Sequence, residues 1–284
     1  ADAAAVRRGA YPPTGAGPGS LVQHLRRLRA MFDDLPGALA RRASEAADSV
    51  RAEPGAGDVP DYYAQDFHFQ SGGHLSKQSA RLYDVQVETL FYGAADAMRR
   101  AALAPIAHEV AGRDQRNLAM LDVACGTGRF LRQTRLAWPA MRLTGIDLSP
   151  AYLAEAEQHM RPLRPARLLL GNAEAMPLAD ASQDIVSSIF LFHELPREVR
   201  RRVAAEMARV LKPGGMLVFI DSLQMGDRPG WDGLLEAFPV RFHEPYFRNY
   251  AIDDLDAVFN AAGLAAEGVS LAFLSKVMVR RKEG

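Results

Sequence analysis

Residues 121–130 read Leu121-Asp122-Val123-Ala124-Cys125-Gly126-Thr127-Gly128-Arg129-Phe130, an apolar run that ends in a glycine turn placed to open a helix. Nineteen residues after Gly128, a second short apolar run ends in Asp147. This order of strand, glycine turn, helix and acid is typical of a nucleoside-binding α/β half-domain. Gly126 and Gly128 let backbone N–H groups approach a ligand without a Cβ in the way. The Asp147 carboxylate can accept both hydrogen bonds of a ribose diol.

The glycine spacing excludes two common nucleotide sites. A dinucleotide turn would need a third glycine at position 131, which is Leu131, and no triphosphate-binding G-x-x-x-x-G-K-[ST] run occurs. The stretch instead resembles the first motif of class I S-adenosylmethionine-dependent methyltransferases, acid-x-Gly-x-Gly-x-Gly. The chain departs from it at Ala124, where a small residue still permits close approach of a ligand. The resemblance implies S-adenosylmethionine as cofactor.

Three later motifs are similar to the same family and follow in the expected order within residues 117–222. A loop at Asn172-Ala173 stands where the family often has an acid that contacts adenine, and a turn from Phe190 to Glu194 ends an apolar strand. The third is the helix end and strand around Lys212-Pro213-Gly214-Gly215. The resemblance implies a cofactor site made of Asp122, Ala124, Gly126, Gly128, Asp147, Leu148, Asn172, Ala173, Phe190 and Tyr83.

The periodicity predicts an α/β fold, a Rossmann-like seven-stranded and mostly parallel sheet with an antiparallel C-terminal edge hairpin and a helical N-terminal cap. Strands are expected near 118–124, 142–147, 167–170, 184–190, 215–221, 268–273 and 276–281. We expect residues 1–20 to be a flexible arm and 21–116 to form the cap. Residues 117–284 should form the catalytic domain, with a substrate-side insertion at about 223–250.

Bulk composition narrows the functional class. The formal net charge is zero, so nothing marks a nucleic-acid binder. No stretch approaches the 18 uninterrupted apolar residues of a membrane span, and no signal-like segment opens the chain. The single cysteine, Cys125, excludes an internal disulfide and is consistent with a reducing compartment. We therefore expect a cytoplasmic enzyme with a small-molecule acceptor, without a nucleic-acid partner and without a membrane span.

Histidines are the candidate catalytic groups, because an acceptor with a labile proton needs a base near neutral pH. His193 has the best placement, at the end of the fourth strand, and His68 and His243 lie in aromatic-rich segments. Glu194 and Glu244 could each orient a neighbouring histidine or bind a cationic substrate. Aromatic residues ahead of the first motif are candidates for a lid over the positive sulfur: Tyr62, Tyr63, Phe67, Phe69 and Tyr83.

A metal site is not predicted. The histidines at 68, 74, 193 and 243 lack helix-spaced ligand pairs, and no H-E-x-x-H motif occurs.

The sequence predicts in-line transfer of a methyl group from S-adenosylmethionine to a small, aromatic or apolar acceptor. Three alternatives stay open: a protein or RNA methyltransferase, a non-catalytic cofactor-binding scaffold, and other chemistry on the same ligand. The acceptor and the oligomeric state, including a homodimer, also stay open.

Overall fold

A single seven-stranded sheet organises the computed structural model, which describes residues 2–13, 21–44, 49–70, 72–161 and 163–284. The strand order is β3-β2-β1-β4-β5-β7-β6, with parallel pairing from β3 to β5 and antiparallel pairing at β5–β7 and β7–β6. The predicted mostly parallel sheet with an antiparallel C-terminal hairpin is thus confirmed. The strands are β1 Ala119–Val123, β2 Arg142–Asp147, β3 Arg167–Leu170, β4 Gln183–Ile189, β5 Leu211–Ser222, β6 Leu264–Ala272 and β7 Ser275–Lys282.

Alternating residues of the buried strands divide the core between the two faces of the sheet. Leu121 and Val123 of β1 belong to one cluster, which helices α8 and α11 cover, whereas Met120 belongs to the other, which α5 and α6 cover. The helices on the sheet are α5 Leu103–Val110, α6 Arg129–Ala137, α7 Pro150–Met160, α8 Arg197–Val210 and α11 Leu255–Ala261, with η4 Gln115–Asn117 before β1 and η5 Phe192–Glu194 after β4.

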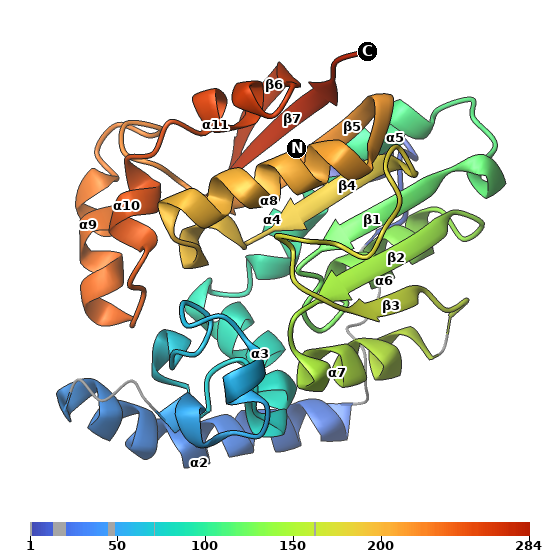
Figure 1. Ribbon diagram of the computed structural model, residues 1–284. Coiled ribbons are helices and arrows are strands. Elements are labelled where there is room, and N and C mark those ends of the chain that lie inside the picture. Colours follow the sequence, from blue (N-terminus) through green and yellow to red (C-terminus); the bar gives the residue numbers. More distant parts are fainter. Residues whose placement is uncertain (1, 14–20, 45–48, 71, 162) are drawn as a thin grey trace.

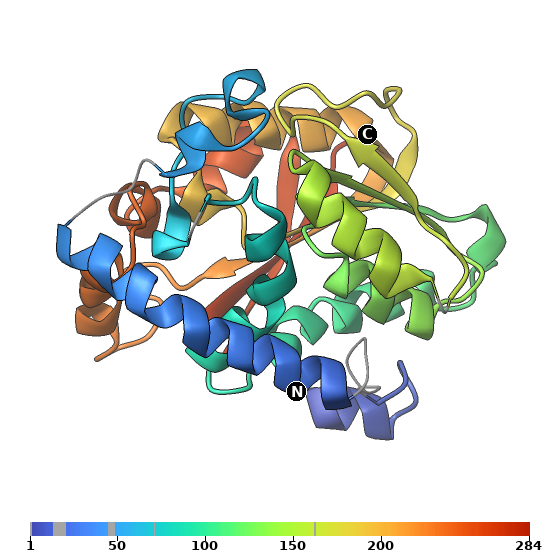
Figure 2. The same ribbon diagram turned by 90° about the horizontal axis from the view of Figure 1, so that it is seen from below.

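A helical cap precedes the sheet in sequence and lies beyond the arrowheads of its parallel strands (Figure 1). Seen from below, the long α2 runs across the cap beside α3, and these two helices are in contact (Figure 2). The carboxyl ends of the parallel strands therefore face the cap, as well as α9 Asp232–Arg241 and α10 Phe247–Ala251. The cap contains α2 Leu21–Ser44, η1 Ser49–Ala52, η2 Ala56–Asp58, η3 Phe67–Phe69, α3 Lys77–Leu90 and α4 Ala95–Arg100.

The predicted flexible arm at residues 1–20 is a packed segment over residues 2–13. Helix α1 (Asp2–Arg7) buries Ala5, and Tyr11 is also buried. Both side chains belong to the core cluster that α5 and α6 cover. The Asp2 carboxylate lies 3.1 Å from Nε of the buried Arg100. An Ala- and Pro-rich composition without periodicity suggested an arm, but one aromatic anchor and one ion pair fix these residues. Residues 14–20 of the predicted arm lie outside the described ranges.

None of the helices in the described ranges combines the length and hydropathy that crossing a bilayer requires.

Gly145 tests how tightly the sheet packs against α6. A Cβ at this β2 position would lie 2.6 Å from Leu131 Cδ1 and 2.7 Å from Cys125 Sγ, and both side chains are buried. We expect Gly145→Ala to lower the free energy of unfolding by about 1–3 kcal/mol, as overpacked cores do. Urea denaturation measures this change. Gly268→Ala in β6 is the control, because its Cβ would meet nothing within 4 Å. Equal stability of the two variants would contradict this packing.

Candidate active site

The turn after β1 is shaped by three residues with left-handed backbone. Ala124, Gly126 and Gly128 have φ values of 55°, 53° and 72°. Ala124 thus has a backbone conformation that a glycine adopts most easily. A Cβ on Gly128 would lie 2.9 Å from Ala156 Cβ, so this glycine also lets α6 begin close against α7. Gly128 therefore serves helix packing as well as the turn.

Asp147 joins the tip of β2 to this turn. One carboxylate oxygen accepts the Gly126 N–H at 2.8 Å, and the other accepts the Ser149 N–H at 2.9 Å. Burial raises the pKa of Asp147, although these two backbone donors act in the opposite direction. Each oxygen retains a second lone pair, which can accept a hydrogen bond from a ligand.

A small pocket of about 40 Å³ opens beside the glycine turn. Asp122, Ala124, Gly126, Phe190 and Tyr83 line it, so the structure brings these five predicted cofactor residues together. Ser187 Oγ donates to Asp122 at 2.6 Å, and burial raises the pKa of this acid to about 7.

Arg99 of α4 also lines this pocket, and sequence reasoning missed it. Its guanidinium is buried and lies 3.6 Å from Glu88 and 3.4 Å from Asp96. No motif surrounds Arg99 in the sequence, because it lies in the cap helix α4 and reaches the turn only through tertiary packing.

Asn172, after β3, uses its side chain within its own loop. Its oxygen accepts the Glu174 N–H at 2.9 Å, and its amide nitrogen donates to Glu174 Oε1 at 3.2 Å. The cap reaches the same loop, since the Tyr62 hydroxyl donates to Glu174 Oε1 at 2.5 Å. Asn172 therefore shapes the loop, and one lone pair of its oxygen is left for a ligand.

Aromatic rings of the predicted lid gather around His74. The rings of Tyr63, Phe67 and Tyr83 have centroids 5.9, 5.3 and 6.2 Å from the His74 ring. The Ser149 hydroxyl donates to the His74 carbonyl at 2.6 Å, which ties this segment to the residue two places after Asp147. The side chain of Phe69 lies outside the described part of the chain.

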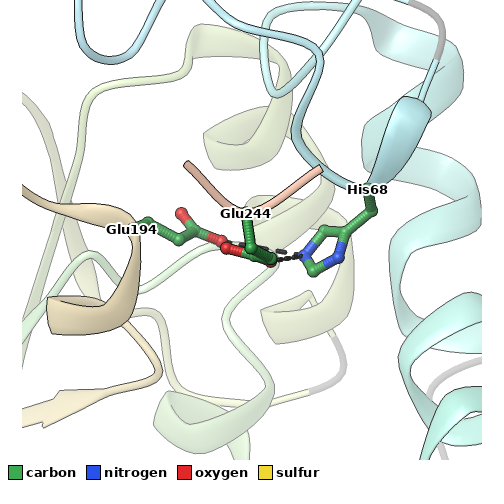
Figure 3. Close-up of side chains that lie close together, drawn as sticks. All are labelled: His68, Glu194 and Glu244. Carbon is green, nitrogen blue, oxygen red and sulfur yellow. Dashed lines mark ion pairs between the residues drawn. The ribbon is translucent and has the colours of Figure 1, made fainter. Parts of the chain in front are cut away.

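Three imidazoles surround Glu194 at the end of β4. Its Oε1 lies 3.9 Å from His68 Nε2, 3.6 Å from His74 Nε2 and 3.9 Å from His193 Nε2. Glu244 joins them, with Oε1 3.1 Å from His68 Nε2. Figure 3 shows the two carboxylates pointing toward each other and toward His68. We call these five residues the His–Glu cluster.

Asp221, at the end of β5, holds the ring of His193. Its Oδ1 lies 2.6 Å from His193 Nδ1, and its other oxygen accepts the N–H groups of Leu191 and Phe192. Burial alone would lower the pKa of His193, but the charge and hydrogen bond of Asp221 outweigh it and raise this pKa to about 10. The sequence named His193 but not Asp221, because their separation of 28 residues carries no motif.

The pKa values of His68 and Glu244 shift in ways that differ from that of His193. Burial, followed by the nearby histidines at 74, 193 and 243, lowers the pKa of His68 to about 3. Burial raises the pKa of Glu244 well above its usual range. His243, the third predicted catalytic histidine, lies beside Gln65, with Nε2 3.3 Å from Gln65 Oε1, and its carbonyl accepts the His68 N–H. His68 and His193 thus both pair with Glu194, whereas His243 contacts the segment that carries His68.

An apolar cavity of about 250 Å³ lies next to the His–Glu cluster. Phe242 and Phe247 are part of its wall, and their rings pack against His68 and His193 at 6.4 and 6.3 Å. Phe91, also in the wall, stacks at 6.1 Å on Phe190 of the pocket beside the glycine turn. The cavity therefore adjoins both the polar cluster and the glycine turn. Further lining residues are Leu90, Trp231, Leu234, Leu235, Phe238 and Leu274.

Comparison with known proteins agrees with this geometry. Residues 120–215 match the model of a family described as a methyltransferase domain. A ubiquinone/menaquinone biosynthesis C-methyltransferase of Methylobacterium nodulans is 32% identical over 165 residues, which are 57% of this chain and 63% of the relative. A demethylmenaquinone methyltransferase of Listeria welshimeri is 33% identical over 141 residues, 49% of this chain and 58% of the relative. The chain thus spans about three fifths of each relative.

Solved structures show the same fold. The methyltransferase in a complex with the Haloferax volcanii Trm112 activator superposes with a TM-score of 0.54 at 16% identity, covering 73% of this chain and 97% of that one. The glycine turn and Asp147 both lie within the matched residues 120–215. The match of residues 120–215 to a methyltransferase domain therefore agrees with what the first motif predicts.

Proposed function

We propose that this protein transfers a methyl group from S-adenosylmethionine to a small acceptor with an apolar body. The observation that carries the proposal is the aromatic cavity of about 250 Å³ next to the glycine turn. A ring or short apolar chain in this cavity would lie beside the pocket where the family places its cofactor. The two relatives named above are quinone-pathway methyltransferases, which supports an acceptor of this class.

The loops that follow β1, β2 and β3 indicate how the cofactor would bind. We propose that Asp147 binds the ribose, and that Leu148, Asn172 and Ala173 border the adenine. The methionine end would enter the pocket beside the turn. There the buried Arg99 offers a partner for its carboxylate, as charge-assisted pairs of arginine and carboxylate commonly do. Tyr83 and Phe190 would face the positive sulfur with their rings.

The reaction is an in-line displacement in which the bond from methyl to acceptor forms as the bond from methyl to sulfur breaks. The protein contributes by holding the reacting atoms close and aligned, which can supply several kcal/mol. His193, fixed by Asp221, and His68 both stand at the rim of the cavity. Because its pKa is raised to about 10, His193 is protonated near neutral pH, so a proton that leaves the acceptor would pass to another member of the His–Glu cluster. His243 would hold the segment of His68 in place.

The remaining expectations from the sequence stay predictions. They are a cytoplasmic location, a homodimer as one oligomeric state, and no nucleic-acid partner.

A protein or RNA methyltransferase would bind a charged polymer and lose activity as salt increases. Methylation of a small acceptor that is insensitive to salt would separate the proposed function from that alternative. A non-catalytic scaffold would bind the cofactor without turnover on any acceptor.

Replacing the ribose-binding acid tests the cofactor assignment. Asp147→Asn keeps the size of the side chain but removes its charge, so we expect the binding of S-adenosylmethionine to weaken by about 1.5–3 kcal/mol. Calorimetric titration measures the change, with thermal unfolding as a check of the fold. Glu157→Gln on the exposed side of α7 is the matched control. Unchanged affinity in Asp147→Asn would remove Asp147 from the cofactor site.

A charge in the aromatic cavity tests the acceptor assignment. Leu234 lines the cavity and is 48% exposed, so Leu234→Glu should be tolerated by the fold. We expect KM for an apolar acceptor to rise by about tenfold or more, because the new carboxylate opposes apolar contact. Cofactor affinity should not change. The acceptor used in this assay is first identified by screening naphthoquinols and hydroxylated aromatic compounds for methyl transfer.

Val269→Glu is the control for this substitution, since Val269 is 55% exposed on β6 and is not part of the cavity. An unchanged KM in Leu234→Glu, or the same increase in both variants, would contradict the placement of the acceptor.

A further inference from the structure

We propose that His68, Glu194 and Glu244 form a binding site for a divalent transition-metal ion at the rim of the acceptor cavity. The three residues come from three separate segments: η3 in the cap, η5 after β4, and the loop between α9 and α10. The sequence predicted no metal site, because their separations of 126 and 50 residues match no ligand spacing.

The ligand atoms already lie at distances that one ion could bridge. His68 Nε2 is 3.1 Å from Glu244 Oε1 and 3.9 Å from Glu194 Oε1, and the three ligand atoms all lie within 4.8 Å of one another. With metal–ligand bonds of about 2.0–2.2 Å, neighbouring ligands around one ion stand about 3–4 Å apart. In Figure 3 both carboxylates and the imidazole converge on the same small region.

Glu244 is a buried acid whose carboxylate has no compensating hydrogen bond in the described part of the chain. Its side chain is fully buried, and neither carboxylate oxygen has a hydrogen-bond partner of acceptable geometry among the described residues. A second carboxylate, Glu194, points at it. A buried carboxylate without a partner is costly, and two that face each other are more so, unless a cation lies between them.

His74 gives a second, independent indication. It is 93% buried, its Nε2 has no hydrogen-bond partner among the described residues, and this atom points toward Glu194 at 3.6 Å. The Ser149 hydroxyl fixes the backbone of His74 from the cofactor side. A further nitrogen ligand or a partner for a metal-bound water is thus available beside the three proposed ligands.

The donor set selects the class of ion. One imidazole nitrogen and two carboxylates suit Mn²⁺, Fe²⁺ or Zn²⁺, whereas Mg²⁺ and Ca²⁺ prefer oxygen ligands and water. Three protein ligands leave coordination positions open, which is typical of metal sites that also bind a substrate.

The location of the site gives the ion a function, and this step rests on the proposed methyl transfer. Phe242 places the cavity wall against His68, and Glu194 follows Phe190 of the cofactor pocket by four residues. An ion held here would bind an oxygen atom of the acceptor and fix it at the end of the cavity. The acceptor class would then be an apolar molecule that carries a hydroxyl or carbonyl oxygen next to the methylated atom.

Metal binding can be measured without any acceptor. The full chain is freed of metal with a chelator, dialysed, and titrated with MnCl₂ and ZnCl₂ by calorimetry, with Mn²⁺ electron paramagnetic resonance as a second readout. We expect one equivalent bound by the wild type. Glu244→Gln should weaken binding by at least about tenfold, because it removes a charged ligand but keeps the size of the side chain.

Controls separate the proposed site from other causes. Glu236→Gln on α9, an exposed acid outside the cluster, should bind the ion like the wild type. If Glu244→Gln fails to fold, His68→Gln provides the same test through the imidazole, and the Co²⁺ absorption spectrum of the wild type reports nitrogen coordination. S-adenosylhomocysteine is titrated into the same preparations, so that loss of the cofactor site is detected separately.

Two results would overturn the proposal. One is that the wild type binds neither ion at millimolar concentration while it still binds S-adenosylhomocysteine, which would leave the methyltransferase proposal intact. The other is that Glu244→Gln and Glu236→Gln bind the ion equally well, which would place the ion elsewhere.

Discussion

The Asp147 carboxylate is the contact on which the arrangement of the site depends. By accepting the N–H groups of Gly126 and Ser149, it fixes the turn after β1 and the start of α7 relative to the tip of β2. Gly128 then lets α6 begin against Ala156 of α7. An acid at this position thus stabilises the fold and presents lone pairs to a ligand, which links the conformation of the turn to recognition of a nucleoside.

The cap completes the site with groups that the sheet does not carry. Its segment over 62–76 reaches the loop after β3 through Tyr62 and the start of α7 through His74. It also places His68 against Glu244 from the loop after α9. Ionisable side chains from the cap and from the loops after β4 and α9 are therefore buried together beside an aromatic cavity. Such a concentration of poorly compensated charge is unfavourable for stability and typical of functional sites.

The sheet and the cofactor turn could be predicted because they depend on local signals. Buried parallel strands read as apolar runs, and the glycines at 126 and 128 mark backbone that other residues adopt with difficulty. The contacts of Arg99, Asp221 and Glu244 depend on packing between distant segments, which leaves no periodicity to detect. The predicted arm was wrong over residues 2–13 for the same reason, since Tyr11 and the Asp2–Arg100 pair act through tertiary contacts. Ligand binding by the predicted cofactor residues stays a prediction.

Titration of the wild-type protein with S-adenosylmethionine, S-adenosylhomocysteine and NADH tests most directly that the Asp147 turn binds the methyl donor. Isothermal calorimetry should give micromolar binding of the first two ligands at one site per chain and no heat from NADH. Binding of NADH instead, or no binding of either methionine-derived ligand by a folded protein, would contradict the assignment.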